Sequence, residues 1–242
     1  MKRFTKLIYL LAASIPIIFI SSCSDWLNPG EATHVTWATL STDYVLQAGK
    51  EYPYYFITDD TLLFCPENHT SIKDFKPIDG QRIILYYQFH GRTPEEKELS
   101  QADRVVKYID IVQMNLVNTE EFLYTMEPDT LGNDRVELQH IWIAGGGLGT
   151  HRYLNLQITI QAMDPEKHSF KMIYDMNRES PLEDGYYCLE LRHEAQNDPQ
   201  YTNFTTLLSY PVIGPCTDQG VKGLKIKVRT INEDLKIYTI DY

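Results

Sequence analysis

The sequence predicts an all-β protein, with an N-terminal five-stranded OB-like barrel followed by a seven-stranded Ig-like β-sandwich. Three observations support this fold class. The aromatic residues, 17 Tyr, 9 Phe and 3 Trp, suit the pleated, half-buried surface of a sheet. The second half repeatedly alternates apolar and polar residues, which is typical of strands with one buried face. The first half contains no ten-residue segment of helical period.

The barrel domain is predicted over residues 33–117. The fourth of its expected strands is apolar on both faces, which indicates a central strand, and the fifth is long enough to wrap around a barrel. Five strands in about eighty-five residues favour a small closed barrel, for which the OB-fold is the common solution. The strands are expected at 35–46, 52–58, 61–65, 82–89 and 105–117.

The sandwich domain is predicted over residues 133–242. Seven alternating segments separated by turn-rich gaps favour two packed sheets, with a second closed barrel as the alternative. Residues 118–132 contain four acids and no cation, together with Pro128 and Gly132, so they are expected to form an acidic linker. The sandwich strands are expected at 136–143, 154–161, 170–175, 187–192, 204–210, 224–229 and 235–241.

The N-terminus has the pattern of an export signal. A basic region with Lys2, Arg3 and Lys6 precedes an apolar run at 7–20, which is shorter than the roughly 20 residues that span a bilayer. The run ends in Ser21-Ser22-Cys23, which resembles a bacterial lipobox. We therefore expect residues 1–22 to be a lipoprotein signal peptide, with an ordinary cleaved signal as the alternative.

Lipidation is expected at Cys23, with residues 23–32 as a lipidated tether. Two or more acyl chains, such as palmitate, hold a protein firmly on a membrane without a transmembrane helix. Ser24 directly after the cysteine fits sorting to the bacterial outer membrane, at the periplasmic face or the cell surface.

The charge of the chain argues against nucleic acid as a partner. The formal net charge is −11, and removal of residues 1–22 takes away three cations and no acids, so the mature charge is −14. Proteins that bind the phosphate backbone neutralise it with basic patches.

Candidate catalytic chemistry is sparse, and the sequence predicts no catalytic residues, no metal site and no cofactor. The seven histidines are dispersed, without a Cys-x-x-Cys or a paired-histidine spacing. No nucleophile motif is present. The glycine-rich segment 145–149 favours a hairpin turn over an anion cradle, because no Lys-Ser/Thr follows it. His193 has the parity of apolar residues in its strand, which favours a core-edge position over a ligand site.

The expected ligand face lies on the barrel, where OB-folds bind ligands on strands 2 and 3. Its aromatic side chains could stack on sugar rings or hold a peptide. The alternative is that half of these rings fill the barrel, as strand alternation requires. The residues are Tyr52, Tyr54, Tyr55 and Phe56.

An odd number of cysteines remains once Cys23 is lipidated, namely Cys65, Cys188 and Cys216. In an exported protein this leaves at least one free thiol or an intermolecular bond. A disulfide between Cys188 and Cys216 is one alternative, because both fall in the sandwich, and free thiols in a reducing habitat are the other.

The order of features resembles the NigD-like lipoproteins of anaerobic gut and oral bacteria. This resemblance implies an N-terminal OB domain and a C-terminal β-sandwich. It also implies a suggested bacteriocin-immunity role, without catalytic residues to carry over. Besides Cys23, the motifs are His34-Val-Thr-Trp37-Ala-Thr39, Phe75-Lys-Pro-Ile-Asp79-Gly80-Gln81-Arg82, Leu131-Gly132-Asn133-Asp134, Ile141-Trp142-Ile143, Tyr153-Leu-Asn155-Leu and Leu191-Arg192-His193-Glu-Ala-Gln-Asn197-Asp198.

Two segments resemble the Asp-Ser/Thr-aliphatic sequon for periplasmic O-glycosylation in this type of bacterium. They are Asp60-Thr61-Leu62 and Asp129-Thr130-Leu131. O-glycosylation is therefore expected at Thr61 and Thr130.

Together these features predict a non-catalytic envelope lipoprotein that binds or scaffolds a protein or glycan partner. The alternatives are a protective, bacteriocin-immunity-type lipoprotein and a small hydrolase with an unrecognised site.

Overall fold

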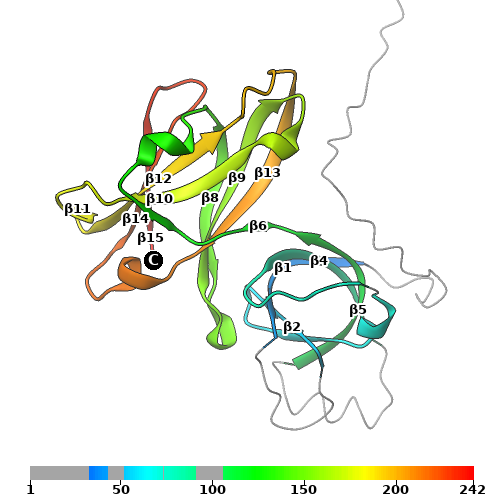
Figure 1. Cartoon of the computed structure of the whole chain (residues 1–242). Coiled ribbons are helices and arrows are strands. Elements are labelled where there is room, and N and C mark those ends of the chain that lie inside the picture. The colour runs from blue at the N-terminus through cyan, green and yellow to red at the C-terminus, as the bar shows by residue number, and fades with distance from the viewer. Residues whose placement is uncertain (1–32, 43–51, 73, 91–105) are drawn as a thin grey trace, which may run out of the picture.

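The computed structural model describes residues 33–42, 52–72, 74–90 and 106–242. The regular elements among them are β-strands and short 3-10 turns, which form a barrel followed by a sandwich (Figure 1). The predicted all-β fold class, a barrel and then a sandwich, is confirmed. Within these ranges no helix has the length and apolar character to cross a bilayer. Residues 1–32, including Cys23, lie outside the described residues.

Five strands close the barrel in the order β1-β2-β3-β5-β4. Strand β1 closes the circle because it pairs antiparallel with both β2 and β4, whereas β3 pairs in parallel with β5. The barrel interior is apolar and includes the fully buried side chains of Leu40, Phe56 and Leu85. The strands are β1 (His34–Ser41), β2 (Tyr55–Thr58), β3 (Leu63–Pro66), β4 (Arg82–Phe89) and β5 (Val106–Leu116).

The sandwich consists of two sheets. The larger has the order β15-β14-β12-β10-β7, with β11 paired to β12, and the smaller has the order β6-β13-β9-β8. Its strands are β6 (Asn118–Thr119), β7 (Leu123–Thr125), β8 (Glu137–Gly145), β9 (Arg152–Ala162), β10 (Ser169–Asp175), β11 (Leu182–Glu183), β12 (Tyr186–Glu194), β13 (Thr202–Pro211), β14 (Gly223–Val228) and β15 (Lys236–Asp241).

The core of the sandwich is formed by the apolar residues of the strands in which apolar and polar residues alternate. On β9 the side chains that face the core include those of Leu154, Leu156, Ile158 and Ile160, and they pack against residues of β12 and β14 from the opposite sheet. Strand alternation places every second residue on this inner face. The outer face of the smaller sheet is instead polar at Asn155 and Ser209, yet both residues are fully buried there.

The sandwich has more strands than the seven that the sequence predicts. The additional strands β6, β7 and β11 are two or three residues long, too short to show alternation. The sheets also contain three parallel pairs, β7 with β10, β6 with β13, and β12 with β14. An Ig sandwich has antiparallel sheets, so the pairing here is mixed. Alternation shows which face is buried but not the direction of the neighbouring strand.

The segment 118–132 is part of the sandwich, so the prediction of an acidic linker is wrong. β6 and β7 each add an edge strand to one sheet. The acids of this segment also have partners: Glu120 pairs with Lys171, and Asp129 lies 3.4 Å from Arg192. Two of the four acids in this segment are therefore paired with cations of the larger sheet.

Candidate functional site

The expected aromatic ligand face is buried. Tyr54 and Phe56 point into the barrel interior, whereas Tyr52 and Tyr55 pack in a second apolar cluster with Leu63 and neighbouring side chains. The four residues are at most 8% exposed. Burial raises the pKa of Tyr54 to about 12. The structure therefore does not present the four rings as the ligand face that the sequence suggests, because two of them fill the barrel interior and two pack in the second cluster.

The disulfide alternative between Cys188 and Cys216 is also wrong, since Cys65, Cys188 and Cys216 are all free thiols. Cys216 is part of the core between the two sheets, and its thiol donates to the carbonyl of Ile213 at 2.9 Å. Cys188 follows the core-facing Tyr187 on β12 and therefore points to the opposite face of the sheet. The two thiols are thus separated by strand alternation.

The two candidate glycosylation residues are exposed. Thr61 has a positive φ of 66° in the turn between β2 and β3. Thr130 lies in the 3-10 turn η3 (Pro128–Leu131), where its hydroxyl donates to the carbonyl of Glu127 at 2.8 Å. Exposure is what a modified residue requires, and glycosylation at both sites stays a prediction.

The glycine-rich hairpin between β8 and β9 docks onto the barrel. A Cβ on the buried Gly147 would come within 2.8 Å of Thr61 Cγ2, so only glycine permits this approach. Trp142 of β8 meets Trp37 of β1 edge to face, with ring centroids 5.3 Å apart. Tyr153 donates from its hydroxyl to the carbonyl of Gly80 at 2.9 Å. The hairpin that the sequence predicts is therefore a fixed contact between the two domains.

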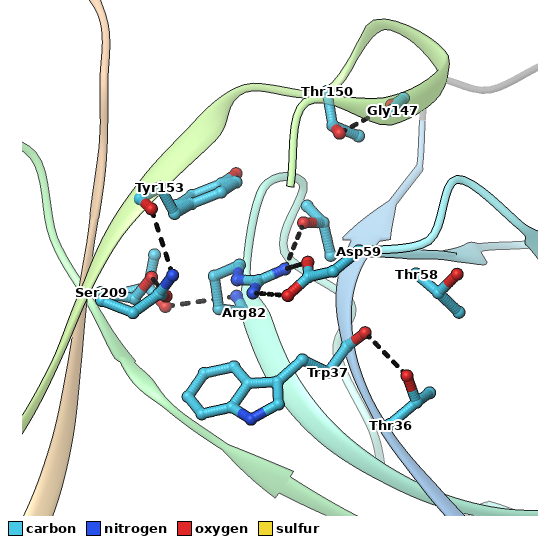
Figure 2. Close-up of polar contacts among 12 residues, drawn as sticks. Thr36, Trp37, Thr58, Asp59, Arg82, Gly147, Thr150, Tyr153 and Ser209 are labelled. Carbon is cyan, nitrogen blue, oxygen red and sulfur yellow. Dashed lines mark hydrogen bonds and ion pairs between the residues drawn. The ribbon is translucent and has the colours of Figure 1, made fainter. Parts of the chain in front are cut away.

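A buried arginine holds this contact together (Figure 2). Arg82 is fully buried, and its two terminal nitrogens lie 2.6 and 2.9 Å from the two carboxylate oxygens of Asp59. Its guanidinium also lies 5.3 Å from the ring of Trp37 and 5.1 Å from that of Tyr153. A planar guanidinium can bind a carboxylate bidentately while stacking on aromatic rings. Sequence reasoning missed Arg82, although a lone cation at the start of an apolar strand was a usable signal.

The best candidate for a binding site is a cleft between the barrel and the sandwich, with a volume of about 650 Å³. Its barrel wall comes from β4 and from the continuous segment 115–118. Its sandwich wall comes from β9, β10, β13 and the turn at 164–168. We call this the interdomain cleft; it is lined by Ile84, Asn115, Leu116, Val117, Asn118, Ile160, Asp164, Pro165, Glu166, His168, Phe170, Phe204, Thr205, Thr206 and Leu207.

The lining of the interdomain cleft is largely apolar with two acids, and no lysine or arginine of the described ranges is part of it. Asp164 and Glu166 supply the two carboxylates. Lys167, in the same turn, lies 4.0 Å from Asp164 and 3.7 Å from Asp198. Glu166 is exposed and forms no ion pair among the described residues. The cleft is therefore suited to a ligand that carries positive charge next to apolar groups.

Behind the cleft, three titratable side chains form a buried row. Nδ1 of His168 lies 2.8 Å from Nε2 of His193, and Nε2 of His168 lies 3.4 Å from Oδ2 of Asp198. The backbone amides of Asp164 and Met163 donate to Asp198, and with His168 they lower the pKa of its carboxyl. Burial, together with the neighbouring His168, lowers the pKa of His193 to about 4. His193 is 3% exposed, which confirms its core-edge position.

This row does not have the arrangement of a catalytic base. Both ring nitrogens of His168 already face a partner, so neither is directed at the cleft. A general base must reach the proton it removes. Within the described ranges, no three His, Cys, Asp or Glu side chains are grouped so as to hold a metal ion.

Comparison with known families identifies the C-terminal part of the chain. Residues 118–242, more than half of the sequence, match the NigD-like C-terminal beta sandwich domain. The chain belongs to the NigD-like family. This match begins at β6, in agreement with the finding that the acidic segment belongs to the sandwich. Comparison with curated proteins gives no match.

Solved structures share the NigD-like fold over nearly the whole length. A protein of unknown function from Bacteroides vulgatus is 20% identical, with a TM-score of 0.64 over 87% of this chain and 91% of that chain. A NigD-like immunity protein from Bacteroides caccae is 18% identical, with a TM-score of 0.55 over 89% and 94%. A candidate lipoprotein from Bacteroides fragilis is 10% identical, with a TM-score of 0.58 over 87% and 98%. At these identities the likeness concerns the fold.

Proposed function

We propose that this NigD-like protein is a lipid-anchored envelope protein without catalytic activity, which binds a protein partner in the interdomain cleft. The observation that carries the proposal is the lining of the cleft, which combines apolar side chains with the acids Asp164 and Glu166 and, among the described residues, contains no lysine or arginine. A partner segment with lysine or arginine beside apolar residues complements such a surface. Two domains contribute to the lining, so binding depends on the intact chain.

The proposed anchor is the lipidated Cys23, attached after removal of residues 1–22. The basic region, the apolar run and the Ser21-Ser22-Cys23 sequence support it, and a structural neighbour is described as a candidate lipoprotein. The proposed location is the bacterial outer membrane, at the periplasmic face or the cell surface. A Cys23→Ala variant should leave the membrane fraction and lose its acyl mass, whereas a variant that stays membrane-bound contradicts the anchor.

Partner binding can be tested in cells with a photo-crosslinking amino acid placed at Thr205, inside the cleft. The same group at Thr239, an exposed residue of β15, is the control. We expect a crosslinked protein at position 205 alone, with a cationic segment at the crosslink. Glu166→Lys should weaken the crosslink, and Glu179→Lys, outside the cleft, should not. Equal labelling at both positions, or a captured glycan, would overturn the proposal of a protein partner.

A second candidate function is an immunity-type role, which is a more specific version of partner binding. It is favoured by a structural neighbour that is described as a NigD-like immunity protein. In this form the partner is a toxin that reaches the envelope. A strain lacking the gene should then become more sensitive to bacteriocins of related bacteria. Glu166→Lys should fail to restore protection, although it reaches the membrane in normal amounts.

A further inference from the structure

One edge of β13 is only partly covered. Along its whole length β13 pairs with β9, from Thr202 opposite Ala162 to Pro211 opposite Tyr153. On its other side β6 pairs with Leu208 and Ser209 alone. No other strand of the described ranges pairs with the outer edge of residues 202–207.

The hydrogen bonds of β6 show which residues direct their backbone groups outward. The amide of Glu120 donates to the carbonyl of Ser209 at 3.1 Å, so the peptide groups of Ser209 point away from β9. In a strand this direction alternates from residue to residue. The amides and carbonyls of Asn203 and Thr205, and the amide of Leu207, therefore point to the open side, whereas the parallel pair of Leu208 with Asn118 places the carbonyl of Leu207 against β6.

This open edge borders the interdomain cleft. Thr205, Thr206 and Leu207 are part of its lining, and the side chains of Asn203 and Thr205 are exposed. Unpaired strand edges are templates for pairing with another chain, and proteins usually protect them with charge, proline or a covering segment. Residues 202–207 contain no proline and no charged side chain, so neither of these two protections acts within the segment.

We propose that the partner binds as an extended strand, which adds to the outer edge of β13 at residues 203–207 and continues the line that β6 begins. The inference rests on the proposed function and specifies its binding mode. The occupant is an extended polypeptide segment in which lysine or arginine alternates with apolar residues. Its backbone pairs with Asn203, Thr205 and the amide of Leu207, while its side chains meet the apolar lining and the carboxylates at 164 and 166.

β6 itself is the internal precedent for this pairing. Its two residues, Asn118 and Thr119, pair in parallel with β13 and come directly from the barrel. Strand addition of this kind gains affinity from main-chain hydrogen bonds and specificity from alternate side chains. The apolar and acidic lining then selects the side chains that each face of the added strand presents.

The test uses the full-length acylated protein in detergent micelles and three synthetic seven-residue peptides. The first peptide alternates lysine and valine, the second alternates glutamate and valine, and the third is the lysine peptide with alternate backbone amides methylated. We expect the lysine peptide to bind about tenfold more tightly than either of the others, because one or two hydrogen bonds or ion pairs are removed. Fluorescence anisotropy measures the three affinities.

Two variants separate the backbone of β13 from its side chains. Thr205→Pro removes the outward amide at an edge position that tolerates proline, and Thr205→Val removes the same hydroxyl but keeps the amide. Of the two variants, we expect only Thr205→Pro to lower the affinity for the lysine peptide, again by about tenfold. Amide exchange followed by NMR is independent of both variants. The amides of residues 203, 205 and 207 should become protected when the lysine peptide binds.

The outcomes distinguish the binding mode from the proposed function. If the lysine peptide binds but methylation has no effect and these amides stay unprotected, strand addition is wrong and the cleft remains the binding site. If the glutamate peptide binds as well as the lysine peptide, the acidic lining does not select the partner. If no peptide binds at millimolar concentration, both the binding mode and the proposed peptide partner are overturned.

Discussion

The buried His193 should make the stability of the protein depend on pH between 7 and 4. Its ring is stacked between Phe170, at 4.7 Å, and His168, at 5.0 Å, and burial lowers its pKa to about 4. In the unfolded chain a histidine titrates near 6.5. Between these two values the unfolded chain binds a proton that the folded chain does not, so stability falls as the pH is lowered.

The size of the loss follows from the two pKa values. Each pKa unit corresponds to about 1.4 kcal/mol, so the free energy of unfolding should fall by about 2 kcal/mol between pH 7 and pH 5. By pH 4 the loss should reach about 3 kcal/mol and then level off. The carboxyl of Asp198, whose pKa is lowered, loses its own contribution only at still lower pH. Between pH 7 and pH 5 the change in the free energy of unfolding therefore reports on His193 and not on Asp198.

A His193→Phe variant keeps the stack on Phe170 but cannot take up a proton. It leaves Nδ1 of His168 without its partner, which costs about 1–3 kcal/mol at every pH. Urea unfolding followed by tryptophan fluorescence gives the free energy at pH 7, 6, 5 and 4. We expect the variant to have a lower free energy of unfolding than the wild type at pH 7. We also expect this free energy to change less between pH 7 and pH 4 than it does in the wild type. His140→Gln, at an exposed position, is the control, and an equally steep curve for His193→Phe would refute the reasoning.

Three further predictions concern stability and the thiols. Asp59→Ala leaves the guanidinium of Arg82 buried without its carboxylate and should cost about 3–5 kcal/mol, measured by urea unfolding; a loss below 1 kcal/mol contradicts the role of this pair. Gly132→Ala and Gly149→Ala both place a Cβ at a φ near 85°, but only the first meets a backbone carbonyl, at 2.4 Å. Both should lose about 1 kcal/mol from the strained φ, and Gly132→Ala should lose clearly more; equal melting temperatures contradict this difference. Without reductant, a thiol reagent should label three cysteines only after denaturation, because the folded protein buries Cys65, Cys188 and Cys216.

The long strands could be predicted because apolar and polar residues alternate along them, and this alternation follows which face of the strand is buried. Leu154, Leu156, Ile158 and Ile160 share one face in the sequence pattern and one core in the structure. The barrel followed from five strands without helical periodicity. β6 and β7 could not be predicted, because two or three residues show no period. The acids around these strands suggested a solvated spacer, but the structure pairs Glu120 with Lys171 and Asp129 with Arg192.

The interdomain cleft could not be predicted from the sequence, because its walls join residues as far apart as Ile84 and Leu207. Local patterns do not show how the barrel turns toward the sandwich. The aromatic run at 52–56 was a misleading signal for the same reason. A strand with apolar residues on both faces can expose one face to a ligand or cover both, and here the structure buries both.

The junction between the domains consists of one buried residue, Val117, between the end of β5 and the start of β6. The last strand of the barrel therefore runs almost directly into an edge strand of the sandwich. A gene fragment that begins at residue 133 would lack two edge strands, so a sandwich expressed alone would have to begin at residue 118. Inserting residues to widen the cleft would interrupt paired backbone. Relatives with this junction would have to change their partners by replacing lining side chains rather than by changing the spacing of the domains.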